Sequence, residues 1–230
     1  MHVAALTDSN CEKFIKSTLT GAAKSPVSRP SKPNVLLLGT SNIKNINEAK
    51  LSDAVAMQKV VKYTIEDTMT YIKSHEVAPD VVILHSLTND LKSHNPQTCV
   101  AKLEELVSCI RDKWPNCKII ISLTTPRKDD IVYHTNGQII NALLKQKIIG
   151  DPARCISYCE HSNMLSYGNP VDNLLTEDKF HLSERGVSML ASNLKREIHS
   201  VLKIPMPAPH RRRSRSRGPK GRGRGARDSS

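Results

Sequence analysis

Residues 35 to 42 read VLLLGTSN, an apolar run that stops at Gly39 and is followed by two hydroxyl side chains, Thr40 and Ser41. A short apolar run cut off by a glycine predicts a fully buried strand that ends at a sheet edge. Open α/β sheets place their ligand sites at the carboxyl ends of their strands. A serine displayed there can act as an activated nucleophile. The alternative interpretation is that Thr40 and Ser41 only cap the next helix.

Strand and helix patterns alternate along the chain, which predicts an α/β fold. Strands are expected at 34–38, 55–63, 80–86, 117–123 and 154–159, and helices at 65–75, 96–114 and 184–202, with one more helix that carries Ile139, Ile140, Leu143, Leu144 and Ile148. Right-handed crossovers would fold these units into a five-stranded parallel sheet that is covered on both faces, in the flavodoxin-like order 2-1-3-4-5.

Two further polar groups follow strands or precede helices at the same predicted edge. Asn89 comes directly after the apolar strand 80–86, where its amide can donate to an oxyanion or can close an Asx turn. Asp178 lies three residues before His181, just ahead of Ser183, the expected cap of the last helix. A carboxylate at this spacing can orient an imidazole and leave its other nitrogen free as a base, although a solvated loop pair is the alternative.

The chain order of Ser, Asn, Asp and His, with four surrounding blocks, resembles the SGNH or GDSL-type hydrolases. The blocks are VLLLGTSN, VVILHSLTNDL, TTPRKDD with the following INALL, and DKFHLSERG, and together they span about residues 34 to 202. The resemblance implies a three-layer α/β/α sandwich with a five-stranded parallel sheet. It also implies hydrolysis of small acyl esters, such as acetyl or lipid-like esters.

Carried over to this chain, the resemblance implies Ser41 as nucleophile, His181 as general base and then general acid, and Asp178 as the residue that orients the imidazole. The oxyanion hole would combine the Asn89 side chain, the Ser41 backbone N–H and the backbone N–H of Lys62, with Tyr63 as the neighbouring alternative.

Three positions depart from the family pattern. Thr40 stands where the family usually has Asp, and Leu87 stands where it usually has Gly. A second family glycine, in the block after the second strand, is replaced here by Lys62 or Tyr63. A backbone N–H survives a change of side chain, so these departures bear on the aim of the oxyanion hole, and losing one donor costs about a hundredfold in rate.

The positive charge is concentrated at one end of the chain. Residues 210 to 230 contain nine basic residues and one acidic residue, Asp228, so +8 of the formal net charge of +12 lies there and +4 in the rest. We expect a leader at 1–33, the hydrolase-like domain at 34–203 and a disordered basic tail at 204–230 that binds RNA or another polyanion through phosphates. A nuclear import signal is the alternative. The tail cations are Arg211, Arg212, Arg213, Arg215, Arg217, Lys220, Arg222, Arg224 and Arg227.

The sequence favours an intracellular protein, cytoplasmic or nuclear, since it shows no signal peptide and no apolar run of about 18 residues. The six cysteines are scattered through apolar segments and are expected to be free thiols. Cys155, Cys159 and His161 have no second pair at ligand spacing, so we expect no metal and no cofactor.

Two hypotheses follow. The first is a serine ester hydrolase with a nucleic-acid-binding tail. The second is a catalytically weak SGNH-like domain that serves as an RNA-binding or assembly module. An esterase domain joined to a basic tail resembles the first open-reading-frame protein of some LINE-type retrotransposons.

Overall fold

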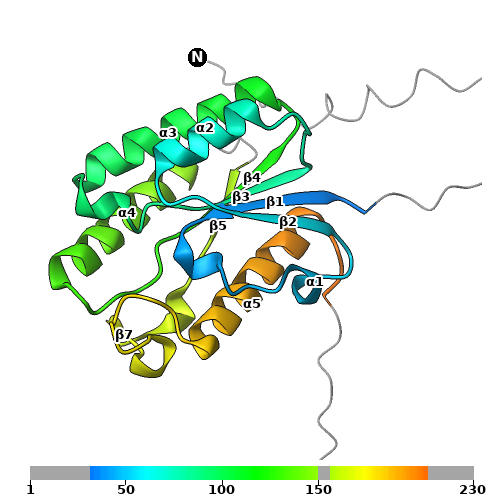
Figure 1. Cartoon of the computed structure of the whole chain (residues 1–230). Coiled ribbons are helices and arrows are strands. Elements are labelled where there is room, and N and C mark those ends of the chain that lie inside the picture. The colour runs from blue at the N-terminus through cyan, green and yellow to red at the C-terminus, as the bar shows by residue number, and fades with distance from the viewer. Residues whose placement is uncertain (1–31, 150–155, 207–230) are drawn as a thin grey trace, which may run out of the picture. The chain divides into compact units, whose positions relative to one another are not determined.

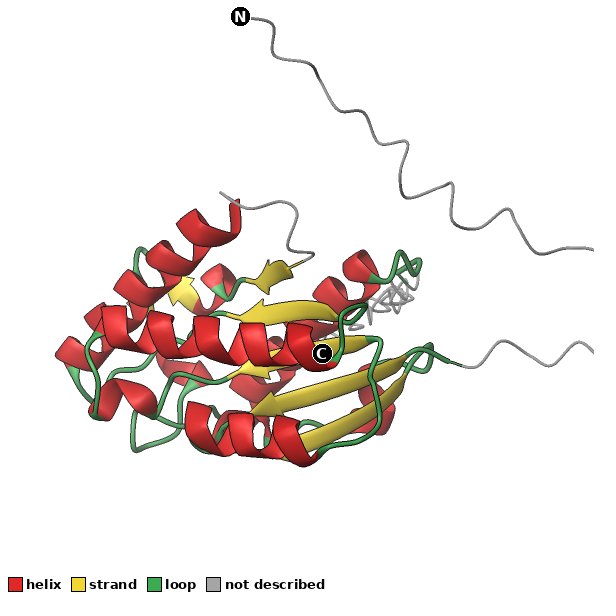
Figure 2. Cartoon of the chain, turned by 90° about the horizontal axis from the view of Figure 1, so that it is seen from above, coloured by secondary structure: helices red, strands yellow, loops and turns green. Residues whose placement is uncertain are grey.

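The computed structural model describes residues 32–149 and 156–206. It contains a parallel sheet of five strands in the order β2-β1-β3-β4-β5, as predicted. The neighbouring strands all pair in parallel, and the long arrows of the sheet in Figure 2 run in the same direction. The strands are β1 (Asn34–Gly39), β2 (Ala56–Val61), β3 (Val81–His85), β4 (Lys118–Ser122) and β5 (Ile156–Cys159).

Helices cover both faces of this sheet, which gives the expected three layers (Figure 1). One face is covered by α2 (Ile65–Ser74), α3 (Pro96–Lys113) and α4 (Ile131–Ile149), and the other by α5 (Glu184–Val201) and the single turn α1 (Glu48–Leu51). The alternation along β1 explains the two cores, because successive side chains of a strand point to opposite faces. Leu36 and Leu38 lie in the core under α2 to α4, and Val35 and Leu37 in the core under α5.

The helix starts follow from side-chain caps. Thr64 accepts from the Asp67 N–H at 3.1 Å, and Ser183 accepts from the Gly186 N–H at 3.2 Å. The Ser183 cap was predicted, and each of the two caps satisfies one of the N–H groups that a helix start leaves without an intrahelical partner.

Gly39 explains why the apolar run of β1 stops where it does. A Cβ built there would lie 2.8 Å from the His85 carbonyl oxygen and 2.9 Å from the His85 Cβ, on the neighbouring central strand. The backbone of β3 cannot move away cheaply, so only glycine fits this strand end.

The apolar residues expected on α4 differ in exposure, since Ile140 and Leu144 are buried and Ile139 is 40% exposed. Two elements too short to give a pattern were missed, α1 and the hairpin of β6 (Leu165–Ser166) and β7 (Asn169–Pro170). Among the described residues, no helix combines the length and apolar character needed to cross a membrane.

The expected leader and basic tail lie outside the described residues, except for 32–33 and 204–206. The division into leader, domain and tail therefore stays a prediction.

Candidate active site

Ser41 opens a short 3-10 helix, η2 (Ser41–Ile43), directly after β1. The Thr40 N–H donates to the His85 carbonyl at 3.2 Å, which ties this turn to the end of β3. Thr40 is the N-cap residue but its side chain makes no capping bond. The capping interpretation of these hydroxyls is therefore wrong for Thr40, and Ser41 is half-buried at the carboxyl edge of the sheet.

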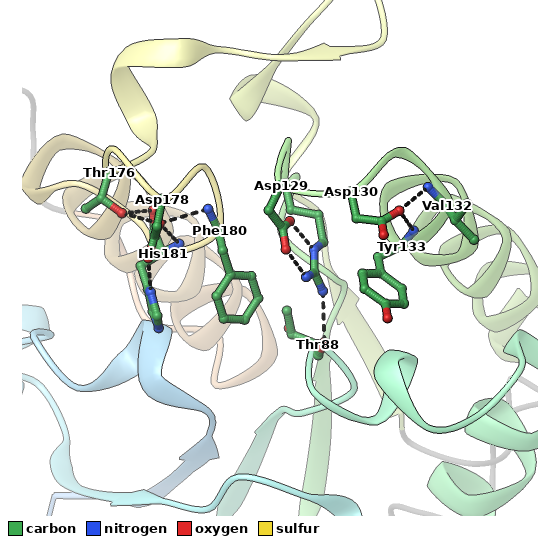
Figure 3. Close-up of polar contacts among 10 residues, drawn as sticks. Thr88, Asp129, Asp130, Val132, Tyr133, Thr176, Asp178, Phe180 and His181 are labelled. Carbon is green, nitrogen blue, oxygen red and sulfur yellow. Dashed lines mark hydrogen bonds and ion pairs between the residues drawn. The ribbon is translucent and has the colours of Figure 1, made fainter.

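Asp178 and His181 form the pair that their spacing predicts (Figure 3). The His181 Nδ1 lies 2.5 Å from the Asp178 Oδ2, and the N–H groups of Phe180 and His181 each donate to Oδ1 at 2.9 Å. The Thr176 hydroxyl adds a fourth bond to this carboxylate at 2.6 Å.

These donors keep the Asp178 carboxylate ionised. The Thr176 hydroxyl and, next in size, the His181 imidazole hold the pKa of Asp178 well below its usual range. An ionised carboxylate accepts from an Nδ1 that carries the proton, which leaves the His181 Nε2 as the basic nitrogen.

The turn that carries His181 lies against the turn that carries Ser41. The Leu182 N–H donates to the Asn42 Oδ1 at 3.3 Å, and the Asn42 amide donates to the Thr125 hydroxyl at 3.2 Å. In Figure 3 the His181 ring extends from its turn toward the blue ribbon of η2. Asn42 was missed by the sequence analysis, because nothing in the pattern shows that its side chain would join two distant turns.

No hydrogen bond joins the Ser41 hydroxyl to His181 among the contacts of the described residues. Such bonds are often long in a site without substrate and tighten when the substrate binds. The His181 side chain is 45% exposed, so its basic nitrogen can be reached from the surface.

The Asn89 loop is clamped onto the segment that follows β2. The Asn89 amide donates to the Tyr63 carbonyl at 3.1 Å, and the Asp90 Oδ1 accepts from the Ile65 N–H at 3.2 Å. The Asn89 side chain makes no capping bond to its own turn, so the Asx-turn interpretation is wrong, and the amide instead bonds a residue on another element. One amide hydrogen of Asn89 remains for another acceptor. Burial raises the pKa of Asp90, more than its bond to Ile65 lowers it.

The structure corrects the expected third donor of the oxyanion hole. The Lys62 N–H donates to the Gly39 carbonyl at 2.8 Å, because the β1–β2 ladder continues one residue past β2. This N–H cannot also serve an oxyanion. Of the two alternatives Tyr63 remains, and its N–H has no hydrogen-bond partner among the residues that the structure describes.

Leu87 has a backbone conformation that glycine adopts easily. Its φ is +87°, in the left-handed region, and its side chain is 1% exposed in the core under α2 to α4. A non-glycine residue is strained there, and burial of the leucine offsets that cost. The replacement of Gly by Leu thus leaves a glycine-like bend before Asn89.

A buried polar chain runs beneath the site, across the ends of β3 and β4. The His85 Nδ1 lies 2.8 Å from the Ser122 Oγ, which lies 2.9 Å from the His161 Nε2, and the His161 Nδ1 accepts from the Asn193 amide at 3.1 Å. His85 is fully buried, but its Nε2 has no partner among the described residues. Burial lowers the pKa of His85 to about 4 and that of His161 to about 3.

These two histidines predict a loss of stability in mild acid. In the unfolded chain both take up a proton near pH 6.5, whereas in the folded chain they stay neutral down to about 4 and about 3. Unfolding therefore binds protons in that window, and the free energy of unfolding should fall as the pH falls, by about 1.4 kcal/mol per pH unit for each histidine. Urea unfolding at a series of pH values measures it. His161→Gln should lower the slope of the free energy of unfolding against pH by the share of one proton bound on unfolding, and an unchanged slope would contradict the assignment.

The zinc set considered in the sequence is only partly described by the structure. The described residues contain no group of three or more His, Cys, Asp or Glu side chains that could hold an ion, and Cys155 of the candidate zinc set lies outside them. Cys99, Cys109, Cys117 and Cys159 are free.

A partly enclosed cavity of about 110 Å³ lies beside the candidate site, between the loop after β4, α4 and the loop after β5. Thr88, Thr125, Arg127 and Asn141 are among the residues that line it, but Ser41, Asn89 and His181 are not. The candidate catalytic groups therefore lie outside this cavity.

No protein-family model and no curated protein sequence matches the chain. Solved structures do match. A member of the lipolytic G-D-S-L family from Veillonella parvula is 14% identical over 73% of this chain and 98% of its own, with a TM-score of 0.60. A family 3 carbohydrate esterase from Clostridium thermocellum is 16% identical over 76% and 99%, with a TM-score of 0.58. The lipase/acylhydrolase from Enterococcus faecalis is 20% identical over 73% and 96%, with a TM-score of 0.56. The described domain has the α/β fold of GDSL-type, or SGNH, hydrolases.

Proposed function

We propose that this chain is a serine ester hydrolase that cleaves small acyl esters, acetyl or lipid-like, through an acyl-enzyme. One observation carries the proposal. Asp178 and His181 form a hydrogen-bonded pair, and the turn that carries them is joined to the turn that begins with Ser41 by the hydrogen bond between Leu182 and Asn42. Structural neighbours that are lipases, acylhydrolases and carbohydrate esterases support this reaction class.

In the first half-reaction, Ser41 Oγ attacks the ester carbonyl carbon while the His181 Nε2 takes the hydroxyl proton. The carbonyl π electrons move to oxygen and form an oxyanion. When the carbonyl reforms, the bond to the alcohol breaks, and His181 gives its proton to the leaving alkoxide. Water activated by His181 then attacks the acyl-enzyme, and the acid is released with Ser41 restored.

The oxyanion would be bound by three donors. These are the Ser41 N–H at the start of η2, the Tyr63 N–H after β2 and the second amide hydrogen of Asn89. The clamp between Asn89 and Tyr63 sets the last two donors relative to each other before substrate binds. Such preorganisation is what makes an oxyanion hole effective.

A fluorophosphonate ester tests the nucleophile directly, because it phosphonylates only an activated serine. We expect mass spectrometry of the labelled protein to find the adduct on the peptide that contains Ser41. His181→Ala should slow the labelling strongly, since the base that activates the hydroxyl is then missing. Adducts spread over other serines, or equal labelling without His181, would contradict the proposal and favour the catalytically weak module.

The basic tail is proposed as a second site, for RNA or another polyanion, on the strength of its +8 charge. This combination of domain and tail would suit a protein of the LINE-type retrotransposon kind. Deletion of residues 210–230 is expected to abolish most affinity for single-stranded RNA. It should also flatten the dependence of log K on log salt, whose slope is about −0.7 for each phosphate contact. Fluorescence anisotropy over a salt series measures both, and equal slopes with and without the tail would contradict the assignment.

A further inference from the structure

Arg127, in the loop between β4 and α4, is a buried cation at the edge of the candidate active site. Its side chain is 2% exposed. Its Nε donates to the Asp129 Oδ1 at 2.6 Å, and its Nη2 bonds the other oxygen of the same carboxylate. Its Nη1 donates to the Thr88 carbonyl at 3.2 Å. A buried charge is costly unless it is paired and hydrogen-bonded, and this two-pronged pair meets both conditions.

Two aromatic rings enclose the guanidinium. The Arg127 Cζ lies 4.4 Å from the centre of the Phe180 ring and 4.8 Å from that of the Tyr133 ring. Figure 3 shows Phe180 on one side of Asp129 and Thr88, and Tyr133 on the other. Phe180 directly precedes His181, and the two rings are in contact with centres 4.6 Å apart. A planar guanidinium stacks on aromatic rings in a way that an ammonium group cannot reproduce.

The backbone around Arg127 binds the same turn. The N–H groups of Lys128 and Asp129 both donate to the Lys179 carbonyl, at 2.8 and 3.2 Å. Lys179 has a φ of +57°, in the left-handed region, so this turn is held in a conformation that few residues adopt unaided. On its other side, Arg127 holds the carbonyl of Thr88, the residue before Asn89.

We propose that Arg127 is a positioning residue for the ester hydrolysis proposed above, on which this inference rests. It touches no reacting atom. It fixes the turn that carries Asp178 and His181 at a set distance from the loop that carries Asn89, so that the base and the oxyanion donor address the same carbonyl. Arginine is required because one side chain must donate to both oxygens of Asp129 and to the carbonyl of Thr88, and must also offer a flat surface to Phe180.

Arg127→Lys keeps the positive charge but loses the two-pronged pair with Asp129 and the flat surface that contacts the Phe180 ring. We expect kcat for p-nitrophenyl acetate to fall about ten- to a hundredfold while KM stays within about twofold, because misplacement by about 1 Å costs that much in rate. The pH profile of kcat/KM should shift with it. In NMR spectra the His181 ring signals should move, whereas those of His85 and His161, in the separate buried chain, should not.

Arg196→Lys is the matched control, since Arg196 is exposed on α5, and it should keep the parent kcat. Phe180→Leu tests the same link should the lysine variant fail to fold, and it should change kcat and the His181 signals in the same direction. A folded variant of either kind with the parent kcat and the parent His181 signals overturns the proposal. Loss of Ser41-dependent hydrolysis in the parent would defeat the proposed function alone, since the His181 signals still report whether Arg127 positions the turn.

Discussion

Replacing Ser41 with Ala is expected to lower kcat for p-nitrophenyl acetate by about a thousandfold or more. The variant lacks the oxygen that forms the acyl-enzyme, and what remains is the contribution of the oxyanion donors and of binding. The fold should not suffer, because Ser41 is half-buried and its side chain caps no helix. Initial rates at saturating ester measure the effect, with the melting temperature recorded in parallel.

Ser93→Ala is the matched control, because Ser93 is exposed in the loop beyond Asn89. It removes the same hydroxyl from the same edge of the domain and should keep the parent rate. A Ser41→Ala variant that hydrolyses the ester as fast as its parent would show that another group is the nucleophile. The catalytically weak module would then become the better account of the domain.

Asp178→Asn is expected to lower kcat by about a hundredfold to ten-thousandfold. The amide has the shape of the carboxylate but not its charge, so it neither fixes the proton on the His181 Nδ1 nor stabilises the imidazolium that forms during attack. In the parent, hydrogen bonds from Thr176 and then His181 hold the pKa of Asp178 well below its usual range. The carboxylate therefore stays ionised throughout the pH range of an ester assay, and no loss of parent activity at neutral pH traces to its protonation.

The comparison for this variant is Asp112→Asn, which removes an exposed carboxylate from α3 and changes the net charge by the same amount. We expect Asp112→Asn to keep the parent kcat, and KM to change little in either variant. Equal rates for Asp178→Asn and its parent would mean that His181 acts without an orienting carboxylate. A large rise in KM alone would mean that Asp178 binds substrate instead.

Local patterns in the sequence were sufficient for the strand order and for the pairing of Asp178 with His181. Apolar runs bounded by Gly, Pro and capping residues define the five strands, and the crossover rule then leaves few sheet orders. Asp178 and His181 are three residues apart in one turn, so their contact is a local property. Two consecutive isoleucines in a helical pattern do not say which of them faces the core, and of Ile139 and Ile140 only Ile140 is buried.

The sequence by itself determined the α/β class, the edge at which the polar residues gather, and Ser41, Asn89, Asp178 and His181 as candidates, because each of these depends on short-range pattern and on general topology. Only the tertiary structure decided which N–H groups are free. The Lys62 N–H donates to the Gly39 carbonyl, whereas the Tyr63 N–H has no partner among the described residues. The buried Arg127 joins the His181 turn to the Asn89 loop. Hydrogen bonds between segments far apart in sequence depend on exact register and packing, and no local pattern encodes those.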